Sequence, residues 1–103
     1  MKLWKTNPGG EVIPVGVSFV TGTITLSGTA FTGNSVTVPT NAAEISVAKA
    51  DEDDANFWIG ESADATGYPD SRIENQGIIG MTNIFFKGAN GQELYYKFTL
   101  LDA

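Results

Sequence analysis

The feature that most constrains the fold is residues 84–100, where apolar and polar side chains alternate on both sides of an Asn-Gly pair. Asn90-Gly91 suits a two-residue type I′ turn, because both central residues of that turn need a positive φ. Side chains of a strand alternate between its two faces, so one parity of each run should face the core. These core-facing residues are Ile84, Phe86, Leu94, Tyr96, Phe98 and Leu100. The stretch predicts a β-hairpin.

Short alternating runs recur along the rest of the chain. They cover residues 15–26, 35–38, 44–49 and 57–60, with a further return to the sheet expected at 78–81. In the first run the apolar residues change parity between positions 19 and 22, which predicts a β-bulge or a bend. Residues 61–77 are polar and rich in turn residues, and we expect a structured loop there. No segment has a helical period of useful length.

These runs indicate an all-β protein, because roughly six or seven short strands separated by Gly, Pro and Asn turns are typical of a sandwich or barrel. A chain of 103 residues fits one domain with its own core. We expect a small single-domain β-sandwich or jelly-roll-like barrel over residues 15–103, preceded by an extended N-terminal arm over residues 1–14. Leu3 and Trp4 give this arm apolar surface that could dock on its own domain or on a neighbouring subunit.

Composition excludes several function classes. The chain has no Cys and no His, which rules out disulfides, thiolate metal sites and a conventional catalytic triad. A net charge of −6 argues against nucleic acid and anionic membranes as partners. No run is apolar enough to span a bilayer, and the first residues lack the apolar core of a signal peptide. We therefore expect neither catalysis nor a cofactor, and synthesis in a cytoplasm.

Acidic residues offer two weaker candidate sites. The run Asp-Glu-Asp-Asp at 51–54 could bind Ca²⁺, but Asn56 stands where an EF-hand needs its turn Gly. We expect a solvated loop without a metal, with a structural Ca²⁺ as the alternative. Four carboxylates in the 61–77 loop could in principle serve glycoside hydrolysis, although a chain of this length has little material for a deep cleft. They are Glu61, Asp64, Asp70 and Glu74.

Several aromatic residues fall on the parity that should face outward or lie in loops: Trp58, Tyr68, Phe85 and Tyr95. Both sheet faces could be covered, the aromatics could form a subunit interface, or they could stack sugars as in a carbohydrate-binding module. Charged residues make up only 17 % of the chain, below the usual quarter. This composition is typical of β proteins whose surface contacts other subunits.

Residues 36–100 carry a recognisable series of segments. Val-Thr-Val-Pro-Thr at 36–40 leads into Ala-Glu-Ile-Ser-Val at 43–47. Ala-Asn-Phe-Trp-Ile-Gly at 55–60, Ser-Ala-Asp-Ala-Thr-Gly-Tyr-Pro at 62–69 and Ile-Phe-Phe-Lys-Gly at 84–88 follow. The series resembles small all-β structural proteins of tailed bacteriophages, the head decoration (cement) and neck proteins. Gly67-Tyr68-Pro69 replaces the Gly-Ile-Pro usual in that family, and Asp70 stands where an apolar residue is usual.

The resemblance implies a non-enzymatic virion component on the capsid surface, assembled in the host cytoplasm. Such proteins commonly form trimers that clamp neighbouring major capsid protein subunits. A neck, tail or fibre component and a carbohydrate-binding β module remain the alternatives. Arg72 is the only Arg, and its planar guanidinium suits carboxylates of another subunit. The residues expected at partner interfaces are Leu3, Trp4, Trp58, Tyr68, Pro69, Arg72 and Phe85.

Overall fold

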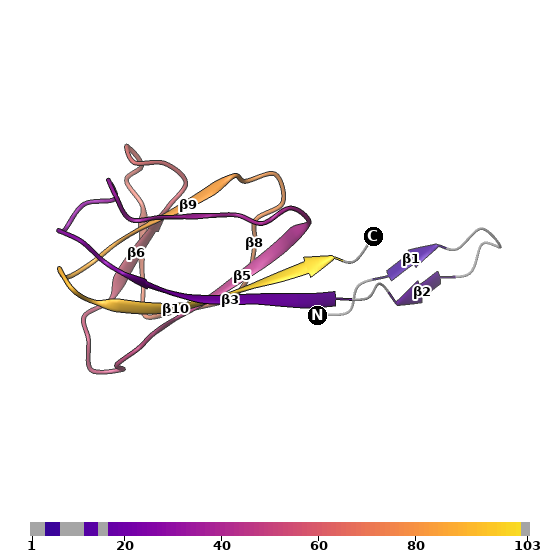
Figure 1. Ribbon diagram of the computed structural model, residues 1–103, viewed down its shortest axis with the longest axis horizontal. Helices are drawn as coiled ribbons and strands as arrows, with labels where there is room; N and C mark the ends of the chain where they lie inside the picture. Colours follow the sequence, from indigo (N-terminus) through magenta and orange to yellow (C-terminus); the bar gives the residue numbers. More distant parts are fainter. Residues whose placement is uncertain (1–3, 7–11, 15–16, 102–103) are drawn as a thin grey trace.

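The computed structural model describes residues 4–6, 12–14 and 17–101. Two four-stranded antiparallel sheets face each other, which confirms the all-β class and the sandwich architecture (Figure 1). The first sheet has the order β3-β10-β5-β8, formed by Val17–Thr25, Glu93–Leu101, Ala42–Lys49 and Arg72–Gly77. The second has the order β4-β9-β6-β7, formed by Ser35–Thr37, Asn83–Lys87, Phe57–Gly60 and Tyr68–Asp70.

Two further strands precede the sandwich. β1 (Trp4–Thr6) and β2 (Val12–Pro14) pair antiparallel as a separate two-stranded sheet. Figure 1 shows this pair beyond the end of the sandwich, past the beginning of β3. The described part of the expected arm is therefore a pair of short strands that stands away from the two large sheets.

The hairpin predicted over residues 84–100 is wrong, because its two strands belong to different sheets. β9 pairs with β4 and β6, whereas β10 pairs with β3 and β5. The turn between them is also not type I′. Gly91 has a φ of 85°, but Asn90 does not have a positive φ, and Gln92 N–H donates to Ala89 O at 3.1 Å. A positive φ at the third position alone belongs to a type II turn.

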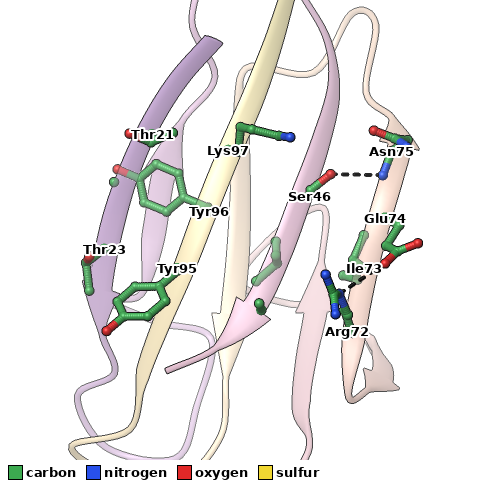
Figure 2. Close-up of a pocket in the computed structure, with 13 residues that line it drawn as sticks. Thr21, Thr23, Ser46, Arg72, Ile73, Glu74, Asn75, Tyr95, Tyr96 and Lys97 are labelled. Carbon is green, nitrogen blue, oxygen red and sulfur yellow. Dashed lines mark hydrogen bonds and ion pairs between the residues drawn. The ribbon is translucent and has the colours of Figure 1, made fainter. Parts of the chain in front are cut away.

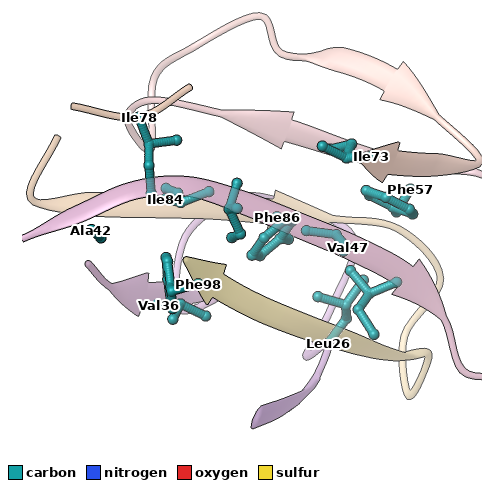
Figure 3. Packing of buried hydrophobic residues seen from close by; sticks show 12 residues of the cluster. Leu26, Val36, Ala42, Val47, Phe57, Ile73, Ile78, Ile84, Phe86 and Phe98 are labelled. Atoms are coloured by element: carbon teal, nitrogen blue, oxygen red, sulfur yellow. The ribbon is translucent and has the colours of Figure 1, made fainter. Parts of the chain in front are cut away.

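The predicted inward faces of β9 and β10 are nevertheless correct. Ile84, Phe86, Leu94 and Phe98 are buried, and Tyr96 and Leu100 pack against the same cluster. Figure 3 shows the core side chains between the two layers of strands. Phe57 and Phe86 meet edge to face with centroids 6.2 Å apart. The two runs thus bury their apolar faces against each other across the core instead of pairing side by side.

The bulge predicted in the first run is wrong as well. β3 and β10 pair without a register shift from Thr25 opposite Glu93 to Val17 opposite Leu101. Since the strand is regular, the change of parity means that its first apolar residues lie on the face opposite the core. Register shifts occur instead in the pairing of β5 with β10 and with β8.

Two further predictions, for residues 61–77 and 78–81, are also wrong in part. The expected loop at 61–77 contains β7 and β8, two short edge strands. Residues 78–81, where we expected the chain to return to the sheet, form a turn closed by a hydrogen bond from Met81 N–H to Ile78 O at 3.1 Å, with Gly80 at a φ of 87°. Ile78 is buried and holds the turn against the core, while Ile79 is 79 % exposed and points into solvent.

Candidate functional site

A continuous stripe of side chains lies on the outer face of the first sheet. We call it the outer stripe, and it consists of Val17, Phe19, Tyr95 and Lys97. Phe19 is 57 % exposed, Tyr95 50 % and Val17 44 %. They have the parity opposite to Leu94 and Phe98 in the continuous β3–β10 register, so they point away from the core. Exposed apolar side chains gathered on one face mark contact sites.

Lys97 joins the apolar parts of the stripe. Its Nζ lies 4.8 Å from the centroid of the Phe19 ring, within cation–π range. Lys97 is opposite Thr21 in β3, between the positions of Phe19 and Tyr95 along the two strands. The stripe therefore combines apolar surface with one positive charge in a chain whose net charge is −6.

A hollow of about 570 Å³, lined by both polar and apolar side chains, adjoins the stripe on the same sheet (Figure 2). Tyr95 and Lys97 line it together with residues of β5 and β8. Ser46 Oγ accepts a hydrogen bond from Asn75 N–H at 3.0 Å, and Asn75 has a φ of 52°. The hollow thus offers hydroxyl and amide groups beside one half-exposed aromatic ring.

Arg72 lies at the β8 side of this hollow. Its Nε is 3.1 Å from Glu74 Oε1, and both side chains are largely exposed. An exposed pair of this kind contributes little to stability, about 0–1 kcal/mol. Arg72 was expected to meet a carboxylate of another subunit, but in this structure its partner is within its own strand.

The other expected interface residues lie elsewhere. Trp58, Pro69 and Phe85 share the outer face of the second sheet, where Trp58 pairs with Pro69 and Gly60 with Phe85. These three residues lie on the opposite side of the sandwich from the outer stripe.

Trp58 is only partly accessible on that face. Lys87 Nζ lies 4.9 Å from the Trp58 ring centroid and 4.8 Å from that of Phe31. Phe31 is buried, because the loop before β4 folds over this sheet. The chain's own loop thus partly covers the outer face of the second sheet. Of the three alternatives for the outward aromatic residues, a covered sheet face therefore applies to this sheet and not to the first.

Tyr68 lies apart from the other aromatics. It is 70 % exposed on the edge strand β7, opposite Ile59. It lines a cleft of about 560 Å³ whose large aliphatic residues are Ile59, Ile73, Ile78, Met81 and Ile84. The cleft lies where the edge strands β7 and β8 of the two sheets face each other. The aromatic set expected from the sequence is therefore distributed over three surfaces.

Two expected residues belong to the arm. Leu3 lies outside the described residues. Trp4 begins β1, and the structure describes its backbone pairing with Pro14.

Three of the acidic candidates, Asp51, Asp70 and Glu74, have partners within their own segments. Asp51 Oδ1 accepts from Asp53 N–H at 3.0 Å, and Asp70 Oδ1 accepts from Arg72 N–H at 3.1 Å. Within residues 4–6, 12–14 and 17–101, no three His, Cys, Asp or Glu side chains gather as a metal site requires. Glu61 and Asp64 are exposed in the loop before β7, while Glu74 is paired with Arg72.

Phe19 and Val17 were not among the residues expected at an interface. Their signal was present as the change of parity in residues 15–26, which we interpreted as a bulge. A regular strand with apolar residues on both faces would have produced the same pattern.

In comparisons with protein-family models, with curated proteins and with solved structures, the chain has no match. Across the described residues, no helix is long and apolar enough to cross a membrane.

Proposed function

We propose that this protein is a non-enzymatic virion structural protein, a capsid decoration (cement) protein that binds the outer surface of the head and stabilises it. The proposal of a virion structural protein starts from the resemblance of residues 36–100 to small all-β phage structural proteins. The observation that carries the proposal is the outer stripe, an apolar surface on a sheet face that the described residues leave open to solvent.

The stripe supports adhesion for a simple energetic reason. Burying the exposed half of Phe19 beneath a partner contributes about 1–2 kcal/mol, and Val17 adds somewhat less. Lys97 favours a partner surface with acidic groups at its rim. In the trimer that the resemblance implies, the three linked copies engage repeated sites of the capsid lattice together, so modest contacts at each site give a higher overall affinity.

The partners we propose are the major capsid protein and other copies of this chain. The family resemblance implies a trimer, located on the capsid surface after assembly in the host cytoplasm. The paired strands β1 and β2 stand beyond the sandwich (Figure 1), and we expect them to contact a neighbouring subunit.

The test is binding to capsids that lack this protein. Purified protein should sediment with such capsids and raise the temperature at which they disrupt. Phe19→Ser should weaken binding about five- to thirtyfold, the factor that corresponds to the lost apolar contact. Ile79→Ser is the matched control, because Ile79 is equally apolar and more exposed but lies in a turn away from the stripe. Wild-type protein that stays in the supernatant would contradict the proposal.

Antibody labelling of intact particles separates the head from other locations. Label over the whole head surface supports a decoration protein. Label confined to the tail vertex would favour a neck, tail or fibre component instead.

The hollow beside the outer stripe, which combines an aromatic ring with polar groups, favours one second candidate, a carbohydrate-binding module. Tyr95 could stack against a sugar ring while Ser46 and the Arg72–Glu74 pair meet its hydroxyl groups. A glycan array would test it: hits that Tyr95→Ala removes would support the module, and an array without hits would exclude it.

A further inference from the structure

The four outermost strands of the sandwich differ in how they are protected against pairing with other chains. β3 and β8 end the first sheet, and β4 and β7 end the second. β4 and β7 are only three residues long, and β7 contains Pro69 and Asp70. β8 carries Arg72, Glu74 and a register shift against β5. Short length, Pro, charges and irregularities are the devices by which proteins block their sheet edges.

β3 has none of these devices. It is nine residues long, contains neither a charged residue nor Pro, and pairs with β10 without a register shift. Within the described residues β10 is its only strand partner, and β1 and β2 form a separate sheet. A long, regular, uncharged edge strand is a ready template for another strand.

We propose that the edge of β3 pairs antiparallel with β3 of a second copy of this chain, about a two-fold axis at Thr21. Phe19–Thr23 of one copy then lies opposite the same residues of the other in reverse order. In this register Thr21 faces its own counterpart, Phe19 faces Thr23, and Val20 faces Gly22. The pairing joins two four-stranded sheets into one continuous sheet.

A second copy fits this edge better than an unrelated strand because the segment is self-complementary. It carries no charge, so the chain's net charge of −6 lies outside the contact. Each bulky side chain in the register lies opposite a small one, Phe19 opposite Thr and Val20 opposite Gly. Isologous contacts of this kind close after two copies and leave no further edge of β3 exposed.

The inference goes beyond the proposed function, since it concerns copies of the chain in solution without capsids. It uses the backbone edge of β3 around Thr21, whereas capsid binding uses the side chains of the outer stripe, and Phe19 is the residue that the two contacts share. If a three-fold contact also forms, the two-fold contact links trimers in pairs. Self-association is therefore tested at Thr21, which is not part of the stripe, so that its loss and the loss of capsid binding are observed separately.

The test is the mass of the assembly that the full chain forms, measured by sedimentation equilibrium. Wild-type protein is compared with variants that carry a charge at Thr21, the residue on the two-fold axis. Wild-type protein should form an even-numbered assembly, a dimer of twice 10.9 kDa or a hexamer. Thr21→Lys and Thr21→Glu each place like charges opposite one another and should weaken the two-fold association about three- to tenfold. An equimolar mixture of the two variants should restore it, because Lys then faces Glu.

Two controls accompany the mixture. Thr37→Lys makes the same exchange at an exposed Thr of the edge strand β4 and should leave the mass unchanged. Thr21→Glu lies opposite Lys97 within its own copy, so this variant keeps its fold even if Thr21→Lys is damaged by the two adjacent Lys residues.

Several results would overturn the inference. These are a wild-type monomer, a trimer without further association, or masses that neither Thr21 variant changes. A monomer whose capsid binding is abolished by Thr21→Lys would also overturn it, because the edge would then receive a strand of the capsid protein.

Discussion

The ring of Tyr96 lies directly over Gly22, the residue opposite it in β3. A Cβ atom at position 22 would overlap atoms of that ring. Tyr96 also packs edge to face on Phe98, with centroids 5.5 Å apart, so it has little freedom to move aside. Glycine at this position is therefore a packing requirement of the first sheet.

Gly22→Ala should destabilise the protein by about 1–3 kcal/mol, the usual cost of overpacking. Thermal unfolding should show a decrease in Tm of about 4–8 °C for each kcal/mol. Gly77→Ala is the matched control, because a Cβ there has no neighbour within 4 Å. Equal Tm values for the two variants would contradict the packing of Tyr96 on Gly22.

The amide of Asn34 holds the loop between β3 and β4 from within. Asn34 is buried, its Oδ1 accepts from Ser27 N–H at 2.9 Å, and its Nδ2 donates to Ser27 O and Ala30 O at 3.0 and 2.8 Å. Asn34→Ala removes these three part-buried hydrogen bonds together, at a cost of about 2–4 kcal/mol. Chemical denaturation should detect this loss, while Asn56→Ala, at an exposed position, should change stability little. A stability of Asn34→Ala within about 0.5 kcal/mol of wild type would disprove this role.

The turn between β9 and β10 distinguishes Gly91 from Asn90. Because only Gly91 has a positive φ, Gly91→Ala should cost about 1 kcal/mol. Asn90→Ala should cost less, since it removes one exposed hydrogen bond, from Gly28 N–H to Asn90 Oδ1 at 2.7 Å. Urea denaturation of both variants provides the measurement. In a type I′ turn both residues have a positive φ, so Asn90→Ala would cost about as much stability as Gly91→Ala. Equal losses for the two variants would therefore contradict the type II turn.

Phe31 anchors the loop between β3 and β4 on the second sheet. It is buried, and Cβ atoms at Gly60 and Gly67 would crowd its ring. Phe31→Ala should destabilise the protein by about 3–5 kcal/mol and expose Trp58 beneath Lys87. The emission maximum of tryptophan fluorescence in the folded variant should move to longer wavelength. An unchanged spectrum together with unchanged stability would show that the loop does not cover this sheet.

Alternation along the chain was sufficient to predict the inward faces of β9 and β10, since burial of Ile84, Phe86, Leu94 and Phe98 requires the same parity in a hairpin and in a sandwich. It did not reveal which strands pair. An Asn-Gly pair between two alternating runs favours a hairpin locally, but here the apolar faces of both runs pack on each other across the core. Sheet membership is thus decided by tertiary packing, which local pattern does not encode.

The candidate site was harder to predict for a related reason. A sequence pattern shows that Val17 and Phe19 are apolar and share a parity, but not that this parity faces solvent. Phe31 and Asn34 lie in a segment without periodicity, so their burial depends on a loop conformation that only the structure shows. Trp58 and Phe85 were correctly placed on an outward face, although Lys87 and the Phe31 loop limit access to it.

The central claim is that the outer stripe contacts the capsid, and covalent footprinting of Phe19 on assembled particles tests it most directly. The protein is labelled with a photoreactive carbene, once free in solution and once bound to capsids, and the modification of each residue is quantified by mass spectrometry. The account predicts that modification of Phe19 and Tyr95 decreases several-fold on capsids while that of Ile79 stays the same. Undiminished labelling of Phe19 on the particle would contradict it.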